Sequence, residues 1–105
     1  MKLSDREHTA VIVDFAGNLI ADDAIPRKPG PMSLTEILEA IATLLDRVCA
    51  KAGVERSALS AFGLGVPGFV DCAEGTVFWS SVLSDRNVPL AAAATARLGL
   101  PTYVD

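Results

Sequence analysis

The chain has 105 residues, of which 50% are hydrophobic and 21% are charged, so it can form one compact domain and cannot be intrinsically disordered. No apolar run approaches the roughly 20 residues that a membrane-spanning helix requires, and the amino terminus lacks the apolar core of a signal sequence. The net charge of −4 disfavours direct contact with nucleic acids. We therefore expect a soluble, cytoplasmic protein that contacts neither DNA nor a membrane through these residues.

The chain contains two cysteines, Cys49 and Cys72, and one histidine, His8. The cysteines lie far apart and form no CxxC motif, and we expect His8 to sit at a frayed start of the chain. This spacing indicates neither a disulfide nor a metal site. We predict that all three residues are structural, with the cysteines acting as small apolar residues in a reducing compartment.

Two strands are predicted in the first quarter of the chain. Residues 8–15 are rich in β-branched side chains, which favour a buried strand. Residues 16–18 (Ala-Gly-Asn) are typical of a tight turn, because Gly and Asn tolerate a positive φ. Residues 19–25 then run back as a second strand, and its Asp22-Asp23 pair suggests a solvated edge.

A long amphipathic helix is predicted over residues 34–52. Ser33 and Glu36 form the pattern of a capping box, in which each side chain binds a free N–H group of the first turn. Gly53 provides the left-handed residue that ends a helix. Apolar residues recur at helical spacing and predict one buried face: Leu34, Ile37, Leu38, Ile41, Leu45, Val48, Cys49 and Ala52.

The second half of the chain predicts further strands and one more helix. Residues 60–66 favour a buried strand, and residues 69–70 with 76–82 favour a hairpin. A helix is predicted over 89–98, with proline at its first position, and a last strand over 101–105. This order of elements indicates an α/β fold with a mixed sheet.

The predicted elements leave part of the sheet uncovered. Two helices cannot cover both faces of a largely apolar sheet, and buried strands normally have both faces covered. We therefore predict that residues 1–105 are a single partial domain, whose remaining apolar face is covered either by a partner or by another part of a longer chain.

Residues 63–68 (GLGVPG) match the G-x-G-x-x-G pattern of dinucleotide-binding sites. In such sites the glycines open a helix whose N-terminus holds the pyrophosphate. Here the first two glycines fall inside a strand, and no helix is predicted for some 20 residues afterwards. We therefore interpret the motif as close backbone packing at a strand end, or as backbone exposed to a ligand at the carboxyl edge of the sheet.

Other chemistry-bearing residues are scarce. Asp14, Asp71 and Asp105 each follow a predicted strand, where carboxylates usually form turns, although catalytic acids also occur there. Ser80 and Ser81 could hydrogen-bond a polyol or could simply end a strand. The sequence has no phosphate-binding loop of the P-loop type and no Ser-His-Asp set, so no catalytic residue is predicted.

Five short segments, in order, resemble the ROK family of bacterial sugar repressors and sugar kinases. They are residues 13–20 (VDFAGNLI), 63–71 (GLGVPGFVD), 75–77 (GTV), 87–90 (NVPL) and 97–105 (RLGLPTYVD). The resemblance covers nearly the whole chain and implies the front part of the amino-terminal lobe of an actin-like ATPase fold, truncated. Members of the family are longer than this chain.

The sequence departs from the family pattern at three places, one of which is Ser81, where the family has an asparagine that contacts the sugar. ROK kinases carry an Asp-x-Gly-x-Thr phosphate loop, where this chain has residues 2–6 (Lys-Leu-Ser-Asp-Arg), without a glycine and with Asp5 placed to repel a phosphate. In the kinases, a glutamate precedes the catalytic aspartate, and Asp105 takes the position of that glutamate. The catalytic aspartate itself is not in the chain. By resemblance, Gly68 and Ser81 line the sugar side of the cleft, and the family's cysteine-rich zinc motif is absent.

Three functional hypotheses follow. The first is the sugar-sensing part of a ROK-type transcriptional regulator, with a sugar effector, no cofactor, a DNA-binding helix-turn-helix outside this chain, and a homodimeric full-length protein. The absent phosphate loop favours this hypothesis and argues against an enzyme. The second is the amino-terminal lobe of an ATP-dependent sugar kinase. The third is an independent α/β domain that completes its sheet by oligomerisation.

Overall fold

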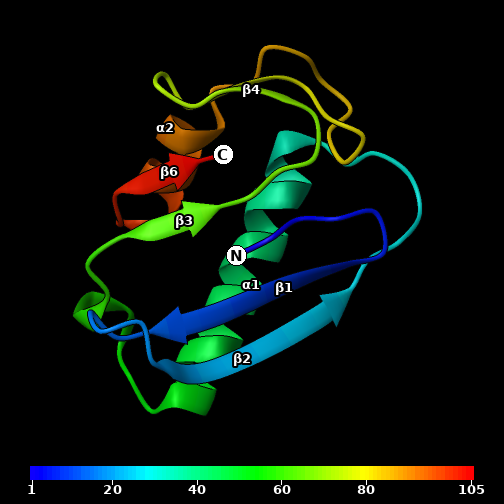
Figure 1. Cartoon of the computed structure of the whole chain (residues 1–105). Helices are drawn as coiled ribbons and strands as arrows, with labels where there is room; N and C mark the ends of the chain where they lie inside the picture. The colour runs from blue at the N-terminus through cyan, green and yellow to red at the C-terminus, as the bar shows by residue number, and fades with distance from the viewer.

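Residues 1–105 form a layer of strands with two helices on one side of it in the computed structural model (Figure 1). Neither helix combines the length and apolarity needed to cross a membrane. The elements, in chain order, are β1 (Glu7–Val13), β2 (Leu19–Pro26), α1 (Leu34–Ala52), a 3₁₀ turn (Arg56–Ala58), β3 (Phe62–Leu64), β4 (Phe69–Asp71), β5 (Thr76–Trp79), α2 (Leu90–Leu98) and β6 (Thr102–Val104).

Two pairs of strands are joined into a mixed layer by the first three residues. β1 pairs antiparallel with β2, and β3 pairs parallel with β6. Between these pairs, the Lys2 N–H donates to the Thr9 carbonyl at 2.8 Å and the Leu3 N–H donates to the Gly65 carbonyl at 2.9 Å. The order across the layer is therefore β2, β1, residues 1–3, β3 and β6, which confirms the predicted mixed sheet. The bridging role of residues 1–3 was not predicted.

The turn between β1 and β2 is organised by Asp14. Its carboxylate accepts hydrogen bonds from the backbone N–H groups of Ala16 and Asn18, both at 2.9 Å. These bonds, with those from Asn18 the strongest, lower the pKa of Asp14. The structure thus confirms the interpretation of this carboxylate as a turn former.

β2 is the edge strand of the layer, as predicted, but the Asp23 side chain is not solvated, which corrects part of the expectation. β2 turns one side toward α1, and the Asp23 carboxylate accepts from Arg47 Nε of that helix at 3.0 Å. The exposed Asp22 alternates to the opposite face, as neighbouring strand residues must. Only Asp22 therefore has the predicted environment.

Helix α1 has the predicted bounds and caps, and its buried face includes Ala42 and Leu44, which the prediction omitted, while Leu34, Leu38 and Ala52 are only partly buried. The Glu36 N–H donates to Ser33 Oγ, and the Ser33 N–H donates to Glu36 Oε1, each at 3.2 Å. Gly53 follows the helix with φ of 70°, in the left-handed region. The core residues Ile37, Ile41 and Leu44 are at most 1% exposed.

Both helices cover the same face of the strand layer. Inward-facing residues of β1, β3 and β6 pack with α1 and α2 in one core of 21 buried residues. On the opposite face, Val11, Val13 and Tyr103 remain between 53% and 68% exposed. The structure confirms the expectation that part of this apolar sheet is uncovered within residues 1–105.

Five predicted elements extend beyond the observed ones, including the first strand, which ends at Val13 and not at residue 15, and the last strand, which holds residues 102–104 of the predicted 101–105. β3 holds only residues 62–64 of the predicted 60–66, because its ladder partner β6 offers three residues. β5 ends at Trp79, since the chain turns at Ser80, whose Oγ accepts from the Val82 N–H at 3.2 Å. Pro89 is the residue before α2 and not its first residue.

The expectation of a frayed environment for His8 is wrong. His8 lies in β1, is 1% exposed, and has no hydrogen-bond partner for either ring nitrogen. Burial lowers the pKa of this imidazole, and the nearby positive charge of Arg27 lowers it further. A neutral, buried histidine with unsatisfied nitrogens is a local cost in stability.

Candidate functional site

A cleft opens where three parallel segments end. Residues 1–3, β3 and β6 run in the same direction, and open α/β sheets collect ligands at the carboxyl ends of such strands. The cleft has a volume of about 420 Å³. Its lining comes from the start of the chain, the segment after β3 and the end of β6: Lys2, Leu3, Ser4, Asp5, Gly65, Val66, Pro67 and Asp105.

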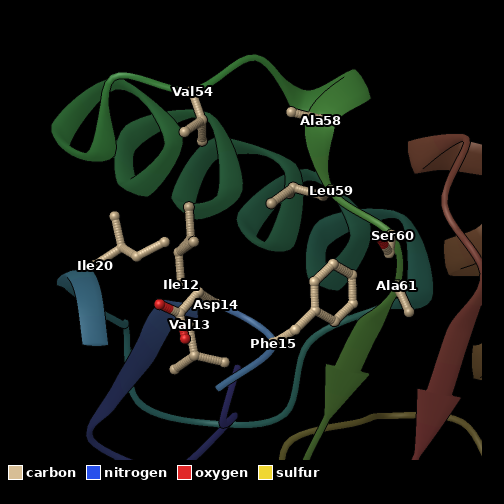
Figure 2. A pocket seen from close by; sticks show the side chains of 10 residues that line it. All are labelled: Ile12, Val13, Asp14, Phe15, Ile20, Val54, Ala58, Leu59, Ser60 and Ala61. Atoms are coloured by element: carbon tan, nitrogen blue, oxygen red, sulfur yellow. The ribbon is translucent and has the colours of Figure 1, made fainter. Parts of the chain in front are cut away.

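A second, apolar pocket lies at the tip of the β1–β2 hairpin (Figure 2). Ile12, Phe15 and Leu59 are among its ten lining residues, eight of which are hydrophobic. Its one ionisable side chain, Asp14, is committed to the hairpin turn. This pocket lacks the convergent polar groups that orient a small ligand, so the cleft at the carboxyl edge is the stronger candidate.

The loop of residues 4–6 forms one wall of the cleft and is closed on itself. Ser4 Oγ donates to the Glu7 carbonyl and accepts from the Glu7 N–H at 3.3 Å. The Arg6 carbonyl accepts from the Arg27 N–H at 3.3 Å, which fixes the far side of the loop. The loop is therefore held by side-chain and backbone bonds and contains no glycine.

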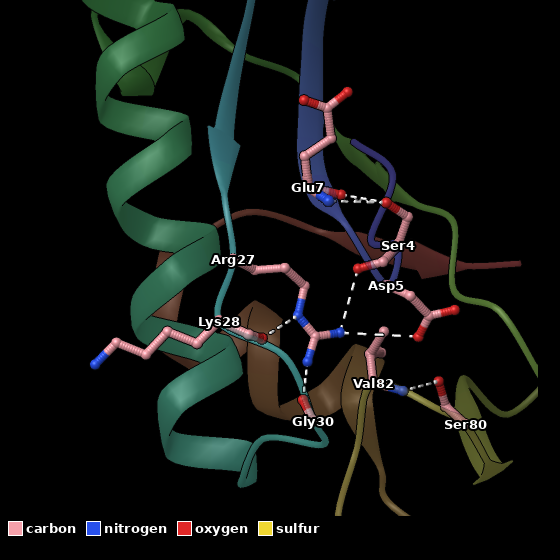
Figure 3. A network of polar contacts seen from close by, with 8 residues as sticks. All are labelled: Ser4, Asp5, Glu7, Arg27, Lys28, Gly30, Ser80 and Val82. Carbon is pink, nitrogen blue, oxygen red and sulfur yellow. Dashed lines mark hydrogen bonds and ion pairs between the residues drawn. The ribbon is translucent and has the colours of Figure 1, made fainter.

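Arg27 anchors this loop through a buried guanidinium (Figure 3). The Arg27 side chain is 2% exposed, and its Nη1 donates to the Ser4 carbonyl at 3.2 Å. The same nitrogen lies 4.0 Å from Asp5 Oδ1, while the other guanidinium nitrogens donate to the carbonyls of Lys28 and Gly30. Sequence analysis missed this residue, because nothing in the pattern Pro-Arg-Lys-Pro indicates a buried arginine.

Gly68 sits where no other residue fits. Its φ is +132°, and a Cβ at this position would lie 2.0 Å from the Trp79 carbonyl oxygen and 2.9 Å from Ser80 Cα. The close approach brings the Pro67–Gly68 turn against the end of β5. It confirms close backbone packing at the last glycine of the motif but not at Gly63, where a Cβ would meet nothing within 4 Å, and no α-helix follows the motif until Leu90.

The two serines after β5 have different environments. Ser80 is 1% exposed and its hydroxyl is committed to the turn. Ser81 is half-buried and its hydroxyl makes no hydrogen bond within the chain. The structure brings Gly68 beside the 79–80 backbone, while neither Gly68 nor Ser81 belongs to the residues that line the cleft itself.

Asp105 and Cys72 meet at the edge of the cleft. The Cys72 thiol donates to Asp105 Oδ1 at 3.2 Å, and this bond is the main cause of a raised pKa of Cys72. The expectation that Cys72 is a small apolar residue like Cys49 is wrong, because its side chain is exposed; Cys49 is buried.

Asp71 accepts a hydrogen bond from the Glu74 N–H at 3.2 Å and acts as a turn former.

No group of three histidine, cysteine or acidic side chains could hold a metal ion. The cleft offers two carboxylates, one lysine, a hydroxyl and backbone groups. This set can hydrogen-bond a small polar ligand.

The sequence matches no protein-family model, but it does match individual proteins. It is 32% identical over 95 residues to a putative xylose repressor from Caldicellulosiruptor sp. (strain Rt8B.4), covering 90% of this chain and 24% of that protein. It is 31% identical over 96 residues to a glucokinase from Streptomyces coelicolor, covering 91% of this chain and 28% of that protein. The chain thus spans about a quarter of these curated relatives.

Solved structures share the fold. A ROK hexokinase from Thermus thermophilus matches with a TM-score of 0.81 at 22% identity, covering 99% of this chain and 33% of that one. A ROK family transcriptional regulator, described as a homologue of the Escherichia coli MLC protein, matches with a TM-score of 0.80 at 19% identity, covering 99% and 26%. A ROK glucokinase from Streptomyces griseus, solved with glucose and AMPPNP, matches equally well at 0.80 and 24% identity, covering 99% and 31%. The chain is therefore a homologue of the ROK-family repressors and sugar kinases, with their actin-like ATPase fold.

Proposed function

We propose that this chain is the front part of the sugar-sensing lobe of a ROK-type transcriptional regulator, and that a sugar or sugar derivative is its ligand. Repressors and kinases among the relatives are equally similar in sequence and fold, so similarity alone does not choose between them. The preference for a regulator comes from the loop of residues 4–6.

That loop is unsuited to hold the phosphates of a nucleotide. Phosphate-binding loops use glycines, because backbone N–H groups must converge on the anion. Here the Ser4 hydroxyl closes the loop, the Arg27 side chain anchors it, and the carboxylate of Asp5 lies on the cleft side. A phosphate in the cleft would meet negative charge in place of N–H donors. This is the observation that carries the proposal.

The edge formed by Gly68 and Ser81 suits a neutral polyol. Ser81 has a free hydroxyl that can both donate and accept hydrogen bonds. The close packing at Gly68 keeps backbone groups near this hydroxyl. In the proposed regulator, a sugar bound here shifts the population between conformations that differ in affinity for DNA. A helix-turn-helix outside these 105 residues would contact the DNA, and the full-length protein would be a homodimer.

A second function, the amino-terminal lobe of a sugar kinase, is supported by the 31% identity to the Streptomyces coelicolor glucokinase. It requires a nucleotide to bind at the carboxyl edge despite the altered loop. The two hypotheses therefore differ in whether ATP binds at all.

An NMR titration of the chain with xylose and with glucose tests the proposal. We expect saturable shifts of the Gly68 and Ser81 amides, with weak affinity because these two residues lie at an open edge and not within the lining of the cleft. Ser81→Ala should weaken binding, whereas Ser57→Ala, at an exposed position in the 3₁₀ turn, should not. Phosphate transfer from ATP to either sugar by a longer polypeptide containing this chain would contradict the regulator hypothesis.

A further inference from the structure

The strand layer has a gap between β1 and β3, which we call the strand slot. Residues 1–3 fill only one end of this slot, where Lys2 pairs antiparallel with Thr9 of β1 and parallel with Gly65, just after β3. β1 continues past Thr9 to Val13 and has no neighbouring strand on that side. Figure 1 shows the start of the chain between β1 and β3, in front of α1.

Backbone groups on both sides of the slot lack partners. The N–H and the carbonyl of Thr9 both bond to Lys2, so the peptide groups of Val11, two residues further along β1, point to the same side. On β3, the Gly63 carbonyl accepts from the Met1 ammonium at 2.8 Å, and the Gly63 N–H points into the slot as well. Neither Val11 nor the Gly63 N–H makes a hydrogen bond across the slot. Two unpaired strand edges therefore face each other.

The floor of the slot is apolar. Ile12 of β1 and Phe62 of β3 line it from the sides, and Leu45 and Val48 of α1 lie beneath it. The cavity has a volume of about 250 Å³, and ten of its eleven lining residues are hydrophobic. It adjoins the apolar pocket at the hairpin tip, with which it shares Leu59 (Figure 2). Apolar side chains would gain stability by entering this cavity.

The existing pairs determine the register of any further strand in the slot. A residue joined to the amino end of Met1 would lie opposite Val11 and Gly63, which are the next positions of the ladder after those that pair with Lys2. Leu3 is buried and Lys2 is exposed, so side chains in this segment alternate between the core and the outer face. The first residue before Met1 would therefore face outward, and the second would enter the apolar cavity.

The environment of the Met1 ammonium favours a strand that is covalently joined to it. Burial lowers the pKa of this ammonium, because its charge is partly removed from water. A peptide N–H at the same place would donate to the Gly63 carbonyl without carrying a charge. It would also continue the ladder in which the Gly65 N–H donates to the Met1 carbonyl at 2.9 Å. A separate peptide or a second copy of the chain would instead have to end against the ammonium.

We infer that the strand slot holds one further β-strand, joined to the amino end of Met1 in a longer polypeptide. The strand runs parallel to β3 and antiparallel to β1, and its inward side chains are apolar and pack over Leu45 and Val48 of α1. The sheet is then completed within one polypeptide, and not by oligomerisation. The chain spans only 24% and 28% of two curated relatives, so related polypeptides have residues outside the matched part. The inference does not depend on which ligand the protein binds.

Two four-residue extensions of the complete 105-residue chain test this register. Each is fused to Met1 and begins after an initiator methionine. Val-Thr-Val-Thr places both valines toward the cavity, whereas Thr-Val-Thr-Val has the same composition and places them outward. The first should raise the folding equilibrium constant, measured by urea denaturation, by about tenfold or more over the original chain, because buried valines stabilise the folded state. The second should change it by less than about threefold.

A third extension, Val-Pro-Val-Pro, separates strand pairing from simple covering of apolar surface. It keeps both inward valines but lacks the N–H groups that would donate to β1. We expect it to lose most of the gain in stability. Amide exchange gives a second readout: the Val11 and Gly63 amides should exchange at least about tenfold more slowly with Val-Thr-Val-Thr than in the original chain, because both amides then belong to a ladder.

Three results would overturn the inference. The first is equal stabilisation by all three extensions, or stabilisation by none. The second is unchanged exchange of the Val11 and Gly63 amides in the Val-Thr-Val-Thr protein. The third is an original chain that sediments as a dimer in which these two amides are already protected, because a second copy would then occupy the slot. Each of these results leaves the proposed sugar-sensing function standing.

Discussion

The β1–β2–α1 unit and the wall of the cleft are stabilised in different ways. The unit consists of a hairpin and a capped helix, whose defining contacts join residues within a few positions of each other, such as Ser33 with Glu36. The cleft and its surroundings join segments farther apart in sequence: Arg27 binds Ser4 in the cleft wall, and Gly68, next to the cleft lining, packs on Trp79. Contacts between residues that are close in sequence therefore determine the β1–β2–α1 unit, and a few contacts between distant residues determine the site.

Gly68→Ala should cause the largest loss of stability. The added Cβ would overlap the Trp79 carbonyl oxygen, and the φ of +132° is strained for alanine, so the turn must move away from β5. We expect a loss of about 2–4 kcal/mol in the free energy of unfolding, measured by urea denaturation. Gly63→Ala is the matched control, because its Cβ would meet nothing within 4 Å. Equal losses in the two variants would contradict the close packing at Gly68.

Arg27→Met should destabilise the protein by about 2–3 kcal/mol. The methionine fills similar space but leaves the carbonyls of Ser4, Lys28 and Gly30 without their donor. Amide exchange should become faster at residues 4–6 than in α1. If α1 and the loop lost protection equally, the anchoring role of Arg27 would be wrong.

His8→Leu should stabilise the protein by about 1–2 kcal/mol at pH 7, because two buried nitrogens without partners are removed. The lowered pKa of His8 has a second consequence. Between that pKa and the unfolded value of about 6.5, the unfolded chain binds more protons, so the stability of the original chain falls as the pH drops through this window. Urea denaturation at pH 7 and pH 5 should show this loss in the original chain and a smaller one in the variant. An identical pH dependence in both would show that His8 is not responsible.

Ser33→Ala should have the smallest effect, a loss of about 1 kcal/mol, because one N–H group at the start of α1 loses its acceptor. Thr35→Ala, at an exposed position of the same turn, should be nearly neutral. Thermal denaturation of the pair distinguishes a capping contact from a general sensitivity of this turn. The cleft should be unaffected, so sugar titration of Ser33→Ala should match that of the original chain.

Sequence-based prediction succeeded where neighbouring residues determine the structure, as in the β1–β2–α1 unit, and was less successful where distant segments meet. The bounds of α1 and the turn at Asp14 were predicted because the residues that determine them are neighbours. His8 was assigned to a frayed end because the bridge from Lys2 to Thr9, which covers that end of β1, joins backbone groups and leaves no sequence pattern.

The site was predicted only in outline. The sequence indicated the carboxyl edge, the absent phosphate loop and the close packing that the structure shows at Gly68. It did not indicate that Arg27 is buried, since that depends on three carbonyls from two loops, nor that Cys72 lies beside Asp105, 33 positions away. Contacts of this kind are determined by how segments meet after folding, and no periodicity or motif encodes them.

Titration of the chain with ATP and Mg²⁺, followed at the amides of Ser4, Asp5 and Arg6, tests the central claim most directly. A loop closed by Ser4 and Arg27 and carrying a carboxylate should show no saturable shift at these three amides, even when the Ser81 amide responds to a sugar. Saturable shifts of the loop amides with ATP, reproduced by AMPPNP, would contradict this account and favour the kinase hypothesis.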